Sequence, residues 1–212
     1  MSLEVGTNDL VKRHEIQYLY LFAHLIDRKY PMGLLDIFKK KEKEPDYDVT
    51  NLKIEDLSMG FILEYDMQSW QVKEEYEYDW GGHNFSKEYL LDSGTEKIFL
   101  SVENKGELYI TVTKDIKIRK LRSDIIDYTV KEKSPPKELI FEGVQYHLHT
   151  DSAGFCQDKT KGSEDSEELI AWEYFDDEEA LVIGITQWGE REFDAVAGKV
   201  IEEFEISNII PA

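Results

Sequence analysis

Two segments of this chain repeat the same strand-and-turn pattern, and this repeat constrains the fold more than any other feature of the sequence. Ile98–Glu107 aligns without a gap on Leu181–Glu190. Strand-forming residues come first in both segments, and the turn glycines Gly106 and Gly189 fall at the same place. A chain that carries one strand-and-turn pattern twice is expected to contain two similar β units.

Matching hairpins precede the two copies. Tyr65–Val72 aligns with Phe141–Leu148, and the aromatic stretch Glu88–Leu90 aligns with Glu173–Phe175. In each hairpin a short turn separates two strand-like runs, as in neighbouring antiparallel strands. The sequence therefore predicts a mainly β fold in which two related antiparallel units, the products of an internal duplication, pack together behind an N-terminal helical segment.

Composition divides the chain into three parts. Residues 1–46 are expected to form the helical extension and a charged linker, 47–133 the first β unit, and 134–212 the second. The boundary between the units is placed at Ser134-Pro135-Pro136, because consecutive prolines do not fit inside a central strand. Just before it, residues 116–130 carry a β-prone pattern and are expected to be extended.

The N-terminal extension carries two apolar clusters. Ile16–Ile26 has apolar residues at helical spacing, which predicts an amphipathic helix, and Leu34–Phe38 is followed by three lysines. Such clusters need a covering surface. We expect this segment to contact a protein partner or a second copy of the chain. Peripheral contact with an anionic membrane is the alternative, which the charge of the body opposes.

Charge and cysteine content limit partners and compartment. The chain has 45 Asp and Glu against 25 Lys and Arg, a formal net charge of −20. This charge repels phosphate backbones, so nucleic acid is not an expected partner. Cys156 is the only cysteine, so no internal disulfide can form and a reducing compartment, the cytoplasm, is expected.

Local patterns of the common enzyme classes are missing from the sequence. It contains no glycine-rich phosphate loop, no Gly-x-Ser-x-Gly, no His-Glu-x-x-His and no paired Cys-x-x-Cys. Cys156 has no neighbouring base in the sequence to lower the pKa of its thiol. We therefore predict no catalytic residue and no cofactor, and we favour a protein that is not an enzyme.

One constellation resembles a metal site. His147, His149 and Asp151 alternate with other residues, so on a regular strand their side chains point to one face. Imidazole and carboxylate ligands of this kind bind zinc or another divalent ion. A polar outer face of an antiparallel strand has the same pattern, and this simpler explanation is preferred.

Aromatic residues offer a second set of candidates. Tyr76, Tyr78 and Trp80 alternate with acidic residues, which predicts either a half-buried strand or an aromatic platform for a ligand. Trp80, Trp172 and Trp188 lie beside turns and are the candidate residues for ligand or partner contact. A groove is expected where the two units meet.

A family resemblance rests on several short segments: Trp70 after a turn, Glu88–Leu91, Phe99–Glu103, and the ending from Trp188-Gly189-Glu190 to Glu205-Ile206-Ser207. Over roughly residues 57 to 210 the chain resembles the bacterial family known as domain of unknown function 4178. Phe99 stands where that family usually has tryptophan. The resemblance implies no catalytic residues, because none are assigned to the family. It does imply a gene setting near membrane-stress and polyamine-related proteins.

These observations favour an uncharacterised cytoplasmic binding or adaptor protein without enzymatic activity, linked to a membrane-associated stress complex. The alternative is a metal-assisted hydrolase that uses His147, His149 and Asp151.

Overall fold

The computed structural model describes residues 52–162 and 165–212, which fold mainly into strands, as the sequence predicts. These residues form one antiparallel sheet of eleven strands. The strands are β1 (Ile62–Tyr65), β2 (Gln68–Asp79), β3 (Phe85–Asp92), β4 (Lys97–Asn104), β5 (Leu108–Asp115), β6 (Glu138–Phe141), β7 (Val144–Asp158), β8 (Ser166–Phe175), β9 (Leu181–Gln187), β10 (Phe193–Ile201) and β11 (Ile206–Ile210).

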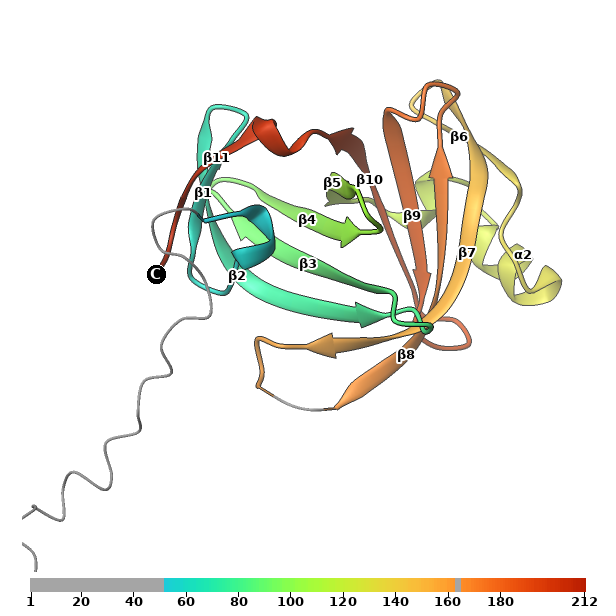
Figure 1. The fold of residues 1–212 in the computed structure, drawn as a ribbon. Helices are drawn as coiled ribbons and strands as arrows, with labels where there is room; N and C mark the ends of the chain where they lie inside the picture. Colours follow the sequence, from blue (N-terminus) through green and yellow to red (C-terminus); the bar gives the residue numbers. More distant parts are fainter. Residues whose placement is uncertain (1–51, 163–164) are drawn as a thin grey trace, which may run out of the picture. The chain divides into compact units, whose positions relative to one another are not determined.

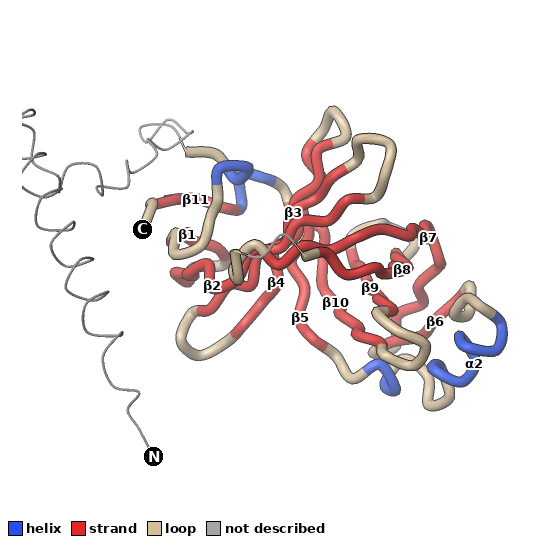
Figure 2. Tube along the Cα trace, turned by 90° about the horizontal axis from the view of Figure 1, so that it is seen from below, coloured by secondary structure: helices blue, strands red, loops and turns tan. Residues whose placement is uncertain are grey.

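Helix is scarce in the described chain. The α-helix α2 (Ile125–Glu132) lies beside β6 in Figure 2, and there are short 3₁₀ turns η2 (Ile54–Asp56), η3 (Ile118–Lys120) and η4 (Glu203–Glu205). None of the helices in this part of the chain has the length and apolar character needed to cross a bilayer.

The expectation of an extended chain through residues 116–130 is wrong, because η3 forms at Ile118–Lys120 and α2 begins at Ile125. Ile125 and Thr129, one helical turn apart, are both buried, so a spacing of four decides which face packs on the body. The β-branched residues here favour strand only weakly, and tertiary packing overrides that preference. Lys133 ends the helix in the left-handed conformation, with φ of 63°.

Eight of the strands close into a ring. The strand order is β11-β1-β2-β3-β4-β5-β10-β9-β8-β7-β6, and β2 pairs in addition with β7. Tyr76–Asp79 of β2 pairs with Phe155–Asp158 of β7, so the ring runs from β2 through β5 and β10 back to β7. The structure has two halves, β1 to β5 with β11 and β6 to β10 with α2; Figure 1 shows β1 to β4 and β11 on one side and β6 to β9 and α2 on the other.

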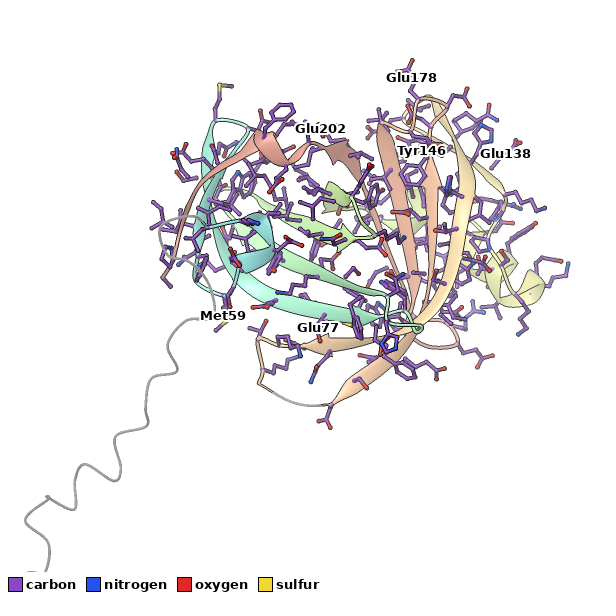
Figure 3. All side chains as sticks on the ribbon, viewed as in Figure 1. Met59, Glu77, Glu138, Tyr146, Glu178 and Glu202 are labelled. Atoms are coloured by element: carbon purple, nitrogen blue, oxygen red, sulfur yellow. The ribbon has the colours of Figure 1, made fainter. Side chains whose placement is uncertain are left out.

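Each half has its own hydrophobic core. The first core contains Trp70, Tyr89, Leu100 and Ile110, and the second contains Tyr146, Trp172, Tyr174 and Ile185. Figure 3 shows Tyr146 over the strands of the second half, whereas Glu138 extends away from it. Burial of these large side chains removes apolar surface from water and is the main force that holds each half together.

The two hairpins predicted from the sequence are present and share one register. Leu63 lies opposite Trp70 in the first, and Leu139 lies opposite Tyr146 in the second. The turns place Asp66-Met67 and Glu142-Gly143 at positive φ, as in type I′ turns, whose twist matches that of the flanking strands.

The helical segment predicted within residues 1–46 lies outside the described residues. The boundary predicted at Ser134-Pro135-Pro136 falls between α2 and β6, and the division into units at this point stays a prediction.

Candidate functional site

A polar cavity lies inside the ring. Its volume is about 190 Å³. All eight ring strands contribute to its wall, for example through Tyr78, Glu88, Ser101, Thr111, Thr150, Glu173, Thr186 and Val196. Because successive side chains on a strand point to opposite faces, the strands that bury apolar residues in the two cores turn their other face toward this cavity.

Strand β4 shows how the sequence builds this arrangement. Leu100 and Val102 enter the first core, while Ser101 and Glu103 line the cavity. On β5, Ile110 and Val112 face the core while Thr111 and Thr113 line the cavity. On β4 and β5 the polar wall is therefore a consequence of alternation. On β8 and β9 consecutive residues line the cavity, and Trp172 and Ile185 also pack in the second core.

A second cavity of about 510 Å³ adjoins the first and shares Tyr78, Glu88, Thr186 and Val196 with it. Its wall is rich in carboxylates, namely Asp115, Asp158, Asp165, Glu167 and Asp194. We call it the acidic mouth. Tyr78 and Glu88 thus lie where the inner cavity meets the acidic mouth.

Glu88 is the most perturbed carboxyl group of the site. The Tyr78 hydroxyl donates a hydrogen bond to Glu88 Oε1 at 2.9 Å. Burial raises the pKa of Glu88 from its ordinary value to about 7, although the hydrogen bond from Tyr78 opposes this shift. Strongly perturbed carboxyl groups that line a cavity are typical of functional sites.

Glu173 repeats this arrangement on the other half. The Tyr109 hydroxyl donates to Glu173 Oε1 at 3.2 Å. Burial raises the pKa of Glu173, and the hydrogen bond from Tyr109 opposes the shift. Each half therefore contributes one carboxyl group that accepts a hydrogen bond from a tyrosine hydroxyl.

Two stacked rings form part of the wall. Tyr78 and Trp80 lie 5.4 Å apart between ring centroids and only 3° from parallel. Trp80 Nε1 donates to Ser86 Oγ at 2.9 Å, which fixes the orientation of the indole. Gly154 gives the ring its space, since a Cβ there would lie 2.8 Å from Trp80 Cε3 and 2.7 Å from the carbonyl oxygen of Asp79.

The three tryptophans predicted for contact all border these cavities. Trp80 and Trp172 line the inner cavity, and Trp188 lines the acidic mouth. Trp172 also packs in the second core, with only 3% of its surface exposed. Trp188 Nε1 donates to Asp194 Oδ2 at 2.9 Å. Their role in contacting a ligand or partner stays a prediction.

His147, His149 and Asp151 are not gathered into a metal site. The register of β7 against β8 shifts between Leu148 and Thr150, so His149 sits in a bulge and the alternation is broken. His147 Nε2 lies 3.2 Å from Asp177, His149 meets the Phe175 ring edge-on at 5.3 Å, and Asp151 is exposed. In the described part of the chain, no three His, Cys, Asp or Glu residues are grouped to hold a metal ion.

Cys156 is buried on β7 opposite Tyr78. Burial raises the pKa of its thiol to about 11, and a hydrogen bond with the Tyr78 hydroxyl lowers it only in part. The thiol is therefore protonated at neutral pH and is a poor nucleophile.

Sequence reasoning missed Glu88 and Glu173. Each is a carboxylate next to large buried residues on a strand, Glu88 beside Tyr89 and Glu173 between Trp172 and Tyr174. That signal was available, because an acid in such a strand must face either solvent or a polar interior. The closure of the ring, which decides between the two, is not visible in the sequence.

The model of the family "Domain of unknown function (DUF4178)" matches residues 58–203, and the chain belongs to this family. An uncharacterised protein of Aquifex aeolicus (strain VF5) is 28% identical over 185 residues, which cover 85% of this chain and 99% of that protein. No solved structure matches the chain.

Proposed function

We propose that this protein binds a small polar molecule in the cavity inside the ring and does so without catalysing a reaction. The observation that carries the proposal is the composition of the wall. Strands that bury apolar residues in the two cores turn hydroxyl, carboxyl and aromatic groups toward one cavity. Concave sites with a few converging polar groups and perturbed carboxyl groups are the usual form of a ligand site.

The side chains of the wall suit binding better than chemistry. Glu88 and Glu173 are held by tyrosine hydroxyls, and the Cys156 thiol is protonated at neutral pH. A metal-assisted hydrolase built on His147, His149 and Asp151 has no support in this geometry, because the bulge at His149 separates the three side chains.

The test is to fill the cavity. Ser101 lines it from β4, so Ser101→Phe places a ring in the space that the ligand requires. Thr95→Phe, in the exposed turn before β4, is the matched control. In a thermal-shift screen of small polar molecules, compounds should raise the melting temperature of the wild type and of Thr95→Phe but not of Ser101→Phe. Compounds that stabilise all three proteins equally would reject the cavity as the binding site.

We also infer that the two halves arose by duplication of one five-stranded unit. Strands β1 to β5 and β6 to β10 pair in the same order, and both halves carry a bulge after the hairpin, at Lys73 and at His149. Val72 and Leu148 are equivalent in the two hairpins, and they pair with Leu91 and Tyr174. Leu91 pairs in turn with Ile98, and Tyr174 with Ile183, so Ile98 corresponds to Ile183 in the sheet. The ungapped sequence alignment, which matches Ile98 with Leu181, is thus displaced by two residues.

An experimentally determined structure tests the duplication. Superposing β1–β5 on β6–β10 should bring Trp70 onto Tyr146 and Ile98 onto Ile183. A superposition that places Ile98 on Leu181 would contradict the register inferred here.

The cellular part of the proposal rests on the sequence. A single cysteine suits the cytoplasm, and the link to a membrane-associated stress complex rests on the gene setting that the family resemblance implies. Contact with a partner protein through residues 1–46 belongs to the same proposal. Co-purification of partners with the full chain, compared with a chain that begins at Pro45, tests it. An identical set of partners for both chains would reject the contact.

A further inference from the structure

The charged side chains of the two cavity walls are mostly negative. The inner cavity contains the carboxyl groups of Glu88, Glu103 and Glu173, and the acidic mouth adds five more. The cationic side chains in these walls are Lys105 and Lys161. A ligand that enters through the acidic mouth therefore moves through a negative potential, which attracts cations and repels anions.

Both lysines are already engaged. Lys105 Nζ lies 2.9 Å from Glu103, and Lys161 Nζ lies 2.6 Å from Asp158. The charges of Lys105 and His149 also act on Glu173 and lower its pKa, although burial raises it more. The groups that shift the pKa of Glu88 are Tyr78 and Asp115, and neither is a cation. Glu88 is therefore the carboxyl group of the inner cavity that most lacks a positive charge beside it.

An ionised carboxyl group in this cavity costs solvation free energy. An ionised carboxylate removed from water loses much of its solvation, and a single hydroxyl donor restores only part of it. Oε1 of each carboxyl group accepts the tyrosine hydrogen bond, from Tyr78 to Glu88 and from Tyr109 to Glu173. A bound cation that donates to the remaining oxygens restores the lost interaction.

The aromatic wall fits the same kind of ligand. Tyr78 and Trp80 stack within the cavity wall, and Tyr109 lines it as well. The faces of tryptophan and tyrosine attract ammonium groups, most strongly where water is excluded. Aromatic faces and carboxylates together form the usual surroundings of a bound organic ammonium ion.

We infer that the ligand of this cavity is a small organic ammonium ion, whose charge is held between Glu88 and Glu173 against the wall formed by Tyr78 and Trp80. This inference rests on the proposed function and names the class of its ligand. The volume of about 190 Å³ corresponds to about six water molecules at ~30 Å³ each, which limits the enclosed part of the ligand to a few non-hydrogen atoms.

Three probes of matched size separate charge from shape. They are n-butylammonium, 1-butanol and butyrate, a cation, a neutral molecule and an anion with the same carbon chain. Isothermal titration calorimetry of the full chain should show n-butylammonium binding at least tenfold more tightly than 1-butanol, with butyrate the weakest of the three.

Two variants remove the charge and keep the shape. Glu88→Gln and Glu173→Gln should each weaken n-butylammonium binding at least tenfold and leave 1-butanol binding unchanged. Gln in either position still accepts the tyrosine hydrogen bond, so the fold is retained. Glu96→Gln, in an exposed turn where Glu96 pairs with Lys114 at 2.8 Å, is the matched control and should bind like the wild type.

The outcomes distinguish this inference from the proposed function. Equal affinity for n-butylammonium and 1-butanol, or unchanged binding in both Gln variants, overturns the ammonium inference and leaves the cavity as a binding site. Failure of all three probes, while another compound binds the wild type and not Ser101→Phe, overturns the ligand class alone. Failure of every compound to distinguish the wild type from Ser101→Phe overturns both.

Discussion

The Tyr78 hydroxyl donates a hydrogen bond of 2.9 Å to Glu88 Oε1 where the inner cavity meets the acidic mouth. Tyr78 lies on β2, which joins the two halves by pairing with β7, and Glu88 lies on the neighbouring strand β3. The bond therefore links the closure of the ring to Glu88, the carboxyl group of the cavity wall whose pKa is raised most.

Because of Glu88, the free energy of unfolding should fall as the pH rises. Its pKa is raised from 4.5 to about 7, so the folded state binds the proton more tightly than the unfolded state does. The resulting stabilisation is complete below pH 4.5 and is lost as the pH rises through 7. Glu88→Gln should match the wild type near pH 4.5 and exceed it above pH 7, by about 3 kcal/mol at most.

Urea unfolding at a series of pH values measures this difference. The ionisable groups near Glu88 include Tyr78, Cys156 and Asp115. The first two stay neutral across this range, because burial raises the pKa of both. A constant difference between Glu88→Gln and the wild type from pH 4.5 to 8 would show that Glu88 is not the group that titrates.

Trp70 and Tyr146 should anchor the two cores to a similar degree. They are 2% and 5% exposed, and each lies opposite a buried leucine in its hairpin. Replacement of either by Ala should cost about 3–5 kcal/mol in the free energy of unfolding. Met67→Ala, at the fully exposed tip of the first hairpin, is the control and should change it by less than about 0.5 kcal/mol. A near-zero loss for Trp70→Ala would show that this residue does not anchor the first core.

Gly198 should be essential to the pairing of β5 with β10. A Cβ at this position would lie 1.9 Å from the carbonyl oxygen of Val112, and backbone cannot move away without breaking strand pairing. We expect Gly198→Ala to cost about 3 kcal/mol or more. Gly184→Ala is the comparison, because its Cβ would meet a Val196 methyl group at 2.9 Å and a side chain can shift. If Gly198→Ala and Gly184→Ala lose the same stability in thermal or urea unfolding, close packing of β5 against β10 at Gly198 is not the cause.

Cys156 should react slowly with thiol reagents in the folded protein. It is buried, and its thiol pKa is raised to about 11. At pH 7.5 a disulfide reagent should modify it at least tenfold more slowly than it modifies the same protein in denaturant. Rapid modification of the folded chain would show that Cys156 is accessible from the acidic mouth.

The local parts of the fold could be predicted from the sequence. The hairpins of Tyr65–Val72 and Phe141–Leu148 depend on neighbouring residues, and both are present where the sequence predicts them. The two-residue displacement of the aligned repeat has a physical cause. Because side chains alternate with period two, a slip of two residues keeps every side chain on its face and leaves the hydrophobic pattern unchanged.

The long-range features of the fold could not be predicted from the sequence. The pairing of Tyr76–Asp79 with Phe155–Asp158 joins segments far apart in the chain, and without it the cavity does not exist. The bulge at His149 interrupts an alternation that looks regular in the sequence, which is why a metal site was a reasonable hypothesis there. Trp80 was a predicted contact residue, but its carboxylate neighbours in the cavity, Glu88 and Glu173, come from other strands.

The indole N–H signals of the tryptophans give the most direct test of the cavity as a ligand site. Trp80 Nε1 bonds to Ser86 in the cavity wall, whereas Trp70 Nε1 donates to the carbonyl oxygen of Tyr65 in the first core. Titration of the ¹⁵N-labelled protein with a small polar ligand should shift the Trp80 signal and leave that of Trp70 in place. Binding that shifts neither signal, or both equally, would contradict the claim that the ligand occupies the cavity inside the ring.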